Sequence, residues 1–257
     1  MNNKEIYSSL LERTNKGQKS FAVLIDPDKI ESTSKLNKLI MMAVENKVDY
    51  FFIGGSLMMH QNLSWVVSAI KEESNIPAIL FPGNNLQLDP HADGLLLLSL
   101  ISGRNPELLI GQHVLVAPVL KKSKLEIIST GYMLIHSGKP TAAGYMSHSQ
   151  PIPADKPDIA ASTAMAGELL GQKIIYMDGG SGAEKPIPPR TIKMVKKSID
   201  IPLIIGGGIT SKDRAFQCLE SGADVIVVGN GIEKNPGLMT EVANIVEQFN
   251  QSLNVHN

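Results

Sequence analysis

Three glycine-bearing loops in the last third of the sequence have the composition of a phosphate-binding site. They are MDGGSGAEKP from Met177, GGGI from Gly206 and GNGI from Gly229, and each follows a short apolar run that is typical of a buried strand. Small residues at the carboxyl end of a strand leave backbone N–H groups uncovered, and the start of the next helix adds partial positive charge. One such loop is more often a plain tight turn. Three in consecutive strand–helix units predict one shared phosphate site.

The residues expected to surround this phosphate are Gly179, Gly180, Ser181, Gly182, Gly207, Gly208, Gly229 and Asn230. Asp178 precedes the first glycine pair, and a carboxylate beside a bound phosphoester can accept a hydroxyl proton as a general base. The alternative role of Asp178 is structural, because aspartate also orients backbone amides or caps a turn. The residues alone leave both roles open.

A second group of polar residues follows the first two apolar runs. Asp26-Pro27-Asp28-Lys29 offers two carboxylates that can hold a hard cation and an ammonium that can contact phosphate oxygens. Gly54-Gly55-Ser56 adds a hydroxyl that can ligate magnesium or a phosphate. Both segments also read as ordinary helix starts, with Asp26 or Ser56 as the capping residue. Their position at the ends of strands favours a functional role.

Uninterrupted apolar runs of this kind indicate parallel strands that are buried on both faces. The predicted strands are 21–25, 50–53, 78–81, 94–98, 132–135, 174–176, 202–205 and 224–228, and patterns with helical spacing separate most of them. A short helix over 4–15 precedes the first strand, and a helix over 239–253 closes the chain. We therefore predict an α/β fold in which residues 1–257 form a single modified (β/α)8 TIM barrel.

The alternation fails at two points. About a dozen residues with Pro90 among them separate the third and fourth strands, so an irregular segment is expected in place of the third helix. The stretch 113–120 (HVLVAPVL) has an uncertain form. A long polar segment, 136–158, follows the fifth strand, and loops of this length inside a compact domain are usually functional.

The composition of the chain indicates which partners it does not bind and in which cellular compartment it works. Net charge is −1 without an extended basic cluster, so nucleic-acid binding is not expected. The single cysteine, Cys218, suits a reducing, cytoplasmic compartment. The first twenty residues carry charges throughout, unlike a signal peptide, and the longest apolar run, 94–98, is too short to span a membrane. We expect a soluble cytoplasmic protein.

Several stretches, in this order along nearly the whole chain, resemble the geranylgeranylglyceryl phosphate synthase family, the PcrB-like prenyltransferases. They are LIDPDK (24–29), IGGS (53–56), FPGN (81–84), GYMLIHSG near the fifth strand (131–138), YMDGGSGAEKPIP (176–188), IIGGGI (204–209) and VVGNGIEKNP (227–236). The first and the fifth are fairly specific, whereas GGGI and VVGN occur in many phosphate-binding barrels.

The resemblance implies a barrel without a regular third helix. It also implies transfer of a geranylgeranyl or related prenyl group from its diphosphate to the C3 hydroxyl of sn-glycerol 1-phosphate, with diphosphate released and Mg²⁺ as the cofactor. Family members form homo-oligomers, and the lipid product suggests transient contact with a membrane.

Carried over to this sequence, the resemblance gives each loop a role. Asp26 and Ser56 would bind Mg²⁺, and Tyr176 and Asp178 would be the catalytic residues. Many members have glutamate where this chain has the shorter Asp178. The acceptor would be bound by Tyr176, Met177, Asp178, Gly179, Gly180, Ser181, Gly182, Gly207, Gly208, Gly229 and Asn230.

Two other classes of protein fit the glycine loops. One is a different phosphate-binding barrel enzyme, such as a sugar-phosphate isomerase or a flavin-dependent oxidoreductase. The other is a non-catalytic barrel that only binds phosphate. The paired Asp26 and Asp28 together with Ser56 favour metal and diphosphate over the first class. Intact acidic and glycine sites argue against the second.

Overall fold

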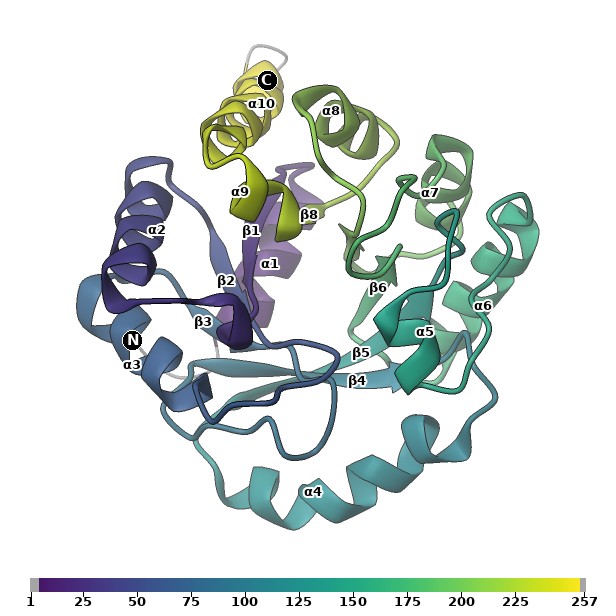
Figure 1. Cartoon of the computed structure of the whole chain (residues 1–257). Helices are drawn as coiled ribbons and strands as arrows, with labels where there is room; N and C mark the ends of the chain where they lie inside the picture. Colours follow the sequence, from purple (N-terminus) through teal and green to yellow (C-terminus); the bar gives the residue numbers. More distant parts are fainter. Residues whose placement is uncertain (1–4, 255–257) are drawn as a thin grey trace.

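Eight parallel strands close into a barrel in which each strand pairs with its neighbour in the chain and β8 pairs with β1 (Figure 1). The computed structural model describes residues 5–254. The strands are β1 (Ser20–Ile25), β2 (Tyr50–Ile53), β3 (Ala78–Leu80), β4 (Gly94–Leu100), β5 (Glu126–Leu134), β6 (Ile174–Asp178), β7 (Leu203–Gly206) and β8 (Val225–Val228). The predicted fold class is confirmed.

Helices surround this barrel and cover its amino-terminal end (Figure 1). They are α1 (Ile6–Asn15), α2 (Thr33–Glu45), α3 (Leu63–Glu73), α4 (Gln112–Lys122), α5 (Ala142–Met146), α6 (Pro157–Leu169), α7 (Pro189–Lys196), α8 (Lys212–Glu220), α9 (Asn230–Lys234) and α10 (Gly237–Asn254). A 3₁₀ turn, η1 (Pro27–Lys29), follows β1, and a π-helical turn, η2 (Glu107–Gly111), leads into α4. Within residues 5–254, no helix is both long enough and apolar enough to cross a bilayer.

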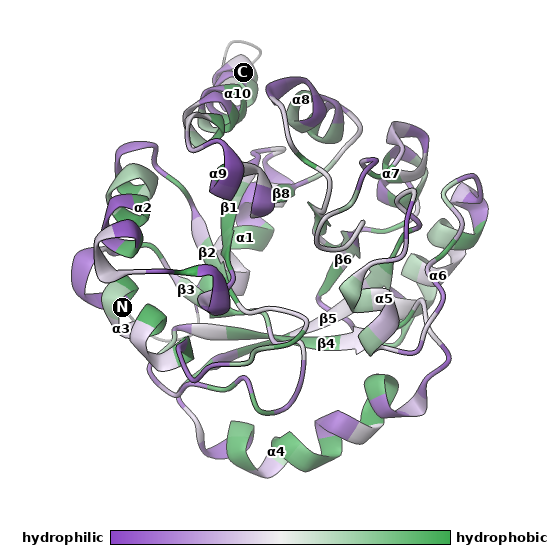
Figure 2. Ribbon diagram, viewed as in Figure 1, coloured by the Kyte–Doolittle hydropathy of each residue, from purple (hydrophilic) through white to green (hydrophobic). Residues whose placement is uncertain are grey.

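The core has two layers because side chains alternate across each strand. An inner cluster fills the barrel with residues such as Phe52 and Tyr176, and an outer cluster lies between the strands and the helices. β6 shows the alternation: Tyr176 belongs to the inner cluster, whereas Met177 packs in the outer one. Most helices show apolar residues on the side that faces the barrel (Figure 2).

Helix α1 packs against the amino-terminal ends of the strands. Leu10 is buried in the inner cluster, with Ile6 and Tyr7 against it. The Glu126 carboxylate at the start of β5 accepts hydrogen bonds from the backbone N–H groups of Ile6 (2.8 Å) and Tyr7 (2.9 Å), which satisfies two free donors at the helix start. Because α1 covers the amino-terminal end of the barrel, a ligand has to approach the opposite end, which is formed by the carboxyl ends of the strands.

Sequence and structure differ most between β4 and α6. β5 starts at Glu126, six residues before the predicted Tyr132, because Ser129 and Thr130 interrupt the apolar run without interrupting the pairing with β4. The uncertain stretch HVLVAPVL is helical and belongs to α4, with Pro118 inside the helix. The polar segment after β5 contains the short helix α5. The segment 81–93 after β3 has no helix, as predicted.

Candidate functional site

The acidic group after β1 is folded into a 3₁₀ turn. Asp26 caps it, because its Oδ1 accepts a hydrogen bond of 3.2 Å from the backbone N–H of Asp28. Burial raises the pKa of the Asp26 carboxyl, and the Lys29 ammonium 3.7 Å away opposes that rise. Asp28 turns to the loop after β2, where its carboxylate accepts from the backbone N–H groups of Met59 and His60. Asp26 is therefore the carboxylate left at the strand end.

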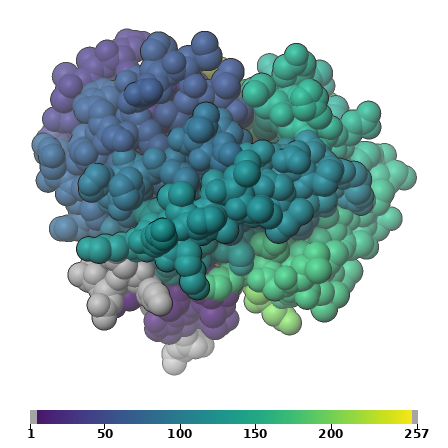
Figure 3. All heavy atoms as spheres, turned by 90° about the horizontal axis from the view of Figure 1, so that it is seen from below, coloured from purple at the N-terminus to yellow at the C-terminus, as the bar shows by residue number. Residues whose placement is uncertain are grey.

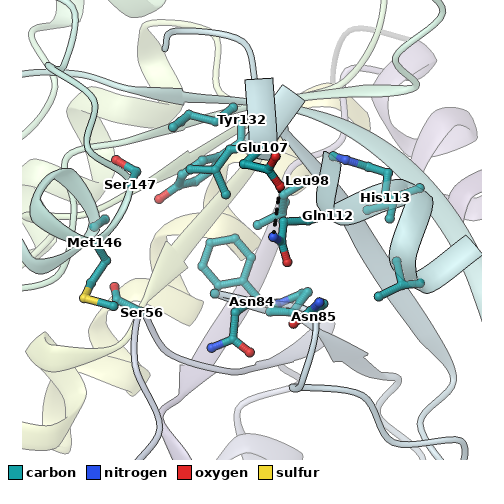
Figure 4. Close-up of a pocket in the computed structure, with 18 of the residues that line it drawn as sticks. Ser56, Asn84, Asn85, Leu98, Glu107, Gln112, His113, Tyr132, Met146 and Ser147 are labelled. Carbon is teal, nitrogen blue, oxygen red and sulfur yellow. Dashed lines mark hydrogen bonds between the residues drawn. The ribbon is translucent and has the colours of Figure 1, made fainter. Parts of the chain in front are cut away.

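The loop after β2 lies directly against Asp26. A Cβ placed on Gly55 would be 3.1 Å from Asp26 Oδ1, so a glycine at this position lets the two loops touch. The next residue, Ser56, lines a groove at the barrel mouth (Figure 4). Asp26 and Ser56, which the resemblance pairs as metal ligands, thus lie on adjoining loops.

Two of the three glycine loops, after β6 and β7, adopt a conformation that suits anion binding. Gly180, Gly182, Gly207 and Gly208 have φ between +73° and +84°, which residues with a Cβ rarely adopt. Successive turns of this kind direct backbone N–H groups toward one side and form concavities for anions. The third loop joins the set through Gly229, which caps α9.

Side chains hold the glycine loops together. Asn230 Nδ2 donates a hydrogen bond of 3.1 Å to Ser181 Oγ, which connects the loop after β8 with the loop after β6. Arg214 on α8 donates to the carbonyl oxygens of Gly208 (2.8 Å) and Glu184 (3.4 Å), which connects the loops after β7 and β6. Sequence reasoning missed Arg214, because nothing in its helical surroundings marks it as different from a surface arginine.

Asp178 ends β6 with its side chain turned toward the barrel mouth. Its Oδ1 accepts a hydrogen bond of 2.7 Å from Gly180 N–H, and its Oδ2 accepts one of 2.6 Å from the Tyr132 hydroxyl. Burial raises the pKa of Asp178, and these two hydrogen bonds oppose the rise. A Cβ on Gly207 would lie 2.7 Å from Asp178 Oδ1, so the second glycine loop packs onto the carboxylate. Sequence reasoning placed Tyr132 in a strand and in the stretch GYMLIHSG, and it missed the contact with Asp178.

The other two residues of β6 in the predicted site lie deeper. Tyr176 is 1% exposed, and its ring stacks on Phe81 with centroids 4.9 Å apart. Its hydroxyl lies beside Gly206, where a Cβ would come within 2.5 Å. Met177 points outward to the helices, so only its backbone remains for a ligand at the barrel mouth.

Lys29 connects the acidic group with the glycine loops. Its Nζ donates a hydrogen bond of 2.6 Å to Asn230 Oδ1 and lies 3.2 Å from Glu233 Oε2 and 3.7 Å from Asp26 Oδ2. The lysine expected to contact phosphate oxygens thus stands between the two predicted anion sites. Its positive charge is shared between the Asp26 and Glu233 carboxylates.

A groove of about 440 Å³ starts at Ser56 and Tyr132 and runs over β4 to the inner side of α4 (Figure 4). Its walls are mostly apolar, with Leu95, Leu97, Leu98, Leu100, Leu108, Val116 and Leu120 among the lining residues. The irregular segment after β3 forms one edge, where a regular helix is missing. Such a groove suits an elongated apolar ligand whose polar end reaches the barrel mouth.

A closed (β/α)8 barrel with glycine-rich loops, a carboxylate at a neighbouring strand end and an apolar groove at its mouth is the architecture of a barrel enzyme that binds its ligands at the carboxyl ends of the strands. Residues 13–248 match the PcrB family. The chain belongs to this family, which confirms the resemblance read from the sequence.

The similarity extends over nearly the full length of the relatives. The chain is 53% identical over 246 residues to the geranylgeranylglyceryl phosphate synthase of Chitinophaga pinensis, which covers 96% of this chain and 97% of the relative. It is 50% identical over 237 residues to the enzyme of the same name from Spirosoma linguale, covering 92% and 95%.

A comparison with solved structures supports the same family. A crystal structure of (S)-3-O-geranylgeranylglyceryl phosphate synthase from Thermoplasma acidophilum, in complex with its substrate sn-glycerol-1-phosphate, superposes with a TM-score of 0.88 at 27% identity. The superposition covers 95% of this chain and 98% of that one. Thiamine phosphate pyrophosphorylase from Pyrococcus furiosus, at 16% identity and a TM-score of 0.55 over 92% and 98% of the two chains, shares the fold alone.

Proposed function

We propose that this protein transfers a geranylgeranyl or related prenyl group from prenyl diphosphate to the C3 hydroxyl of sn-glycerol 1-phosphate and releases diphosphate. The observation that carries the proposal is the contact of Tyr132 with Asp178. Tyr132 lines the apolar groove, and Asp178 lies among the glycine loops. A prenyl chain in the groove and a glycerol phosphate on the loops would therefore meet at this pair.

The acceptor would be bound mainly by backbone groups. Its phosphate would lie among residues 179–182, 207–208 and 229–230, with Lys29 close to the last pair. A phosphate held there would orient the hydroxyl at the other end of the glycerol toward Asp178, and such orientation contributes a large share of rate enhancement in two-substrate reactions. Asp178 would accept the hydroxyl proton, and buried Tyr176 would position the strand end beneath it.

Mg²⁺ belongs to the proposal, with Asp26 and Ser56 as its ligands from the protein. The donor set fits, because Mg²⁺ typically takes one or two carboxylates and completes its shell with water and substrate phosphate oxygens. Within residues 5–254, no group of three or more acidic, histidine or cysteine side chains could hold a metal without such help. The chemistry that a bound Mg²⁺ supplies is neutralisation of the diphosphate as it departs.

The direct test is a product assay with sn-glycerol 1-phosphate and prenyl diphosphates of graded length, in which the groove should select one length. sn-Glycerol 3-phosphate serves as the matched control, because it differs only in configuration. Failure with every diphosphate, despite binding of glycerol phosphate, would favour a non-catalytic phosphate-binding barrel. Flavin absorbance in the purified protein would favour the oxidoreductase alternative.

We propose that several copies of the chain assemble into a homo-oligomer. It is supported by exposed apolar side chains on the ring of helices, among them Leu169 and Leu170 at the end of α6. Light scattering of the purified protein tests it, and a mass of one chain at micromolar concentration would refute it.

Transient membrane contact is proposed for the side that carries α4. Ile110, Val114, Leu115 and Val119 are exposed there, and the exposed Lys121 and Lys122 follow at the end of the helix. Figure 2 shows the apolar colouring of α4, and Figure 3 looks onto the side of the molecule that α4 crosses. Apolar residues flanked by lysines suit an anionic lipid surface. Co-sedimentation with anionic and with zwitterionic vesicles tests this contact.

The proposed location is the cytoplasm. Cys218 is a free, buried thiol, which suits a reducing compartment. Fractionation of cells that express the protein would locate it directly.

A further inference from the structure

Gln87 occupies an unusual place for a polar side chain. It lies in the irregular segment after β3, yet it is only 4% exposed, while its neighbour Leu86 is 86% exposed. Burying an amide costs free energy unless its donors and acceptors find partners. The partners of Gln87 therefore show what the segment is shaped to do.

The Gln87 amide binds backbone groups of two different loops. Its Oε1 accepts hydrogen bonds from Gly83 N–H at 3.0 Å and Gly55 N–H at 3.4 Å. Its Nε2 donates to the Gly55 carbonyl oxygen at 2.9 Å. One side chain thus pairs with both the N–H and the C=O of Gly55, as a neighbouring strand would.

Glycines make this arrangement possible. A Cβ on Gly83 would lie 2.3 Å from the Gly55 carbonyl oxygen, and one on Gly54 would lie 2.0 Å from the Phe81 carbonyl oxygen. The loops after β2 and β3 are therefore in backbone contact, without side chains between them. Gly55 is held between Gln87 on one side and the Asp26 carboxylate on the other.

From these contacts we propose that Gln87 is a positioning residue for the diphosphate site: it fixes the Gly55–Ser56 backbone against Asp26. The inference rests on the proposed function, because it assigns a task in binding the diphosphate and its metal. It also accounts for the irregular segment. A regular third helix would satisfy its own amides, whereas this segment extends one amide across two strand ends.

The test compares Gln87→Met, which keeps the length and removes the hydrogen bonds, with Gln87→Glu, which keeps the acceptor oxygens and loses the Nε2 donor. Leu86→Ala is the control from the same segment. We expect Gln87→Met to raise the KM for prenyl diphosphate and the half-saturating Mg²⁺ concentration about tenfold, the equivalent of one hydrogen bond in a buried site. The KM for glycerol phosphate should stay within about twofold, because other loops bind it.

Backbone amide exchange supplies a readout that does not depend on turnover. Exchange of the Gly55 and Gly83 amides should accelerate in Gln87→Met and not in Leu86→Ala. Gln87→Glu should fall between the two, since its carboxylate can still accept from both amides. Faster exchange with an unchanged KM for the diphosphate would overturn the positioning role. An equal rise in the KM of both substrates would overturn it as well.

Failure of the proposed function remains distinguishable from failure of this inference. If the wild type transfers no prenyl group to glycerol phosphate, binding of inorganic diphosphate with Mg²⁺ to wild type and Gln87→Met still tests the positioning role by calorimetry. Weaker binding in the variant would uphold it, and equal binding would refute it. If Gln87→Met does not fold, the same calorimetry is done with Gln87→Leu, which also removes the hydrogen bonds and adds no charge that would itself repel diphosphate.

Discussion

The Tyr132 hydroxyl donates a hydrogen bond of 2.6 Å to Oδ2 of Asp178. Tyr132 comes from β5 and lines the groove, whereas Asp178 ends β6 beside the glycine loops. The bond therefore lies where the two proposed substrates would meet. It also compensates for part of the cost of burying the Asp178 carboxylate, since a hydrogen bond to the charged form of an acid stabilises that form.

Replacing Asp178 with asparagine should lower the rate of prenyl transfer by about 10²–10⁴-fold, the usual contribution of a general base. Steady-state kinetics with saturating acceptor measure it. An unchanged rate would eliminate the base role.

The same substitution should raise the free energy of unfolding at pH 7. Burial raises the pKa of Asp178 in the folded protein above its ordinary value of 3.8, so its ionisation destabilises the fold as pH rises through the folded-state pKa. Asparagine carries no charge and avoids this cost. Thermal unfolding of both proteins at pH 7 and at pH 4 checks the sign, because the advantage of Asp178→Asn should shrink at the lower pH. A variant that is less stable at pH 7 would contradict it.

Tyr132→Phe should shift the acid limb of the pH–rate profile to higher pH. The variant loses a hydrogen bond that lowers the pKa of Asp178, so that pKa rises further and the base is protonated over a wider range. The measurement is kcat/KM for the acceptor between pH 5 and 9. Tyr145→Phe is the control, because Tyr145 is 79% exposed on α5. If the acid limbs of the wild type and Tyr132→Phe coincide, Tyr132 does not influence the pKa of the group that acts as base.

Asp26→Ala should abolish transfer at all Mg²⁺ concentrations while the fold persists. The reason is that Asp26 supplies the carboxylate at the β1 end, because the nearby Asp28 carboxylate is turned to the backbone N–H groups of Met59 and His60. Turnover against Mg²⁺ concentration and circular dichroism measure the two effects. Asp200→Ala, an exposed aspartate before β7 at the opposite end of the barrel, serves as the control. Near-normal turnover in Asp26→Ala would refute the metal assignment.

Gly207→Ala should weaken the binding of glycerol phosphate, and Gly171→Ala should not. Both glycines have φ above +80°, so both substitutions strain the backbone by roughly 1–2 kcal/mol. The two added Cβ atoms differ in their surroundings. The Cβ at position 207 lies 2.7 Å from Asp178 Oδ1, whereas the Cβ at position 171 has no atom within 4 Å. Calorimetric titration with glycerol phosphate separates the two effects. Equal losses of affinity would place Gly207 outside the binding site.

Most of the fold could be predicted from patterns in short segments of the sequence. Uninterrupted apolar runs predict parallel strands, because both faces of each strand are buried, and seven of the eight strands lie within a few residues of their predicted positions. Pro90 and the short distance between β3 and β4 predict the missing helix. β5 was placed too late, because polar Ser129 and Thr130 hide a strand whose pairing with β4 determines its start.

For the site, too, the sequence predicted some residues, and the tertiary structure was needed for the contacts between them. The sequence by itself determined the glycine loops, Asp26 and Asp178, because a glycine that must adopt a positive φ and a carboxylate at a strand end are properties of short segments. Only the tertiary structure decided their partners. Tyr132 lies 46 residues from Asp178, Gln87 lies 32 from Gly55, and Lys29 lies 201 from Asn230. Such contacts arise when the barrel closes and brings strand ends together, which no spacing along the chain encodes.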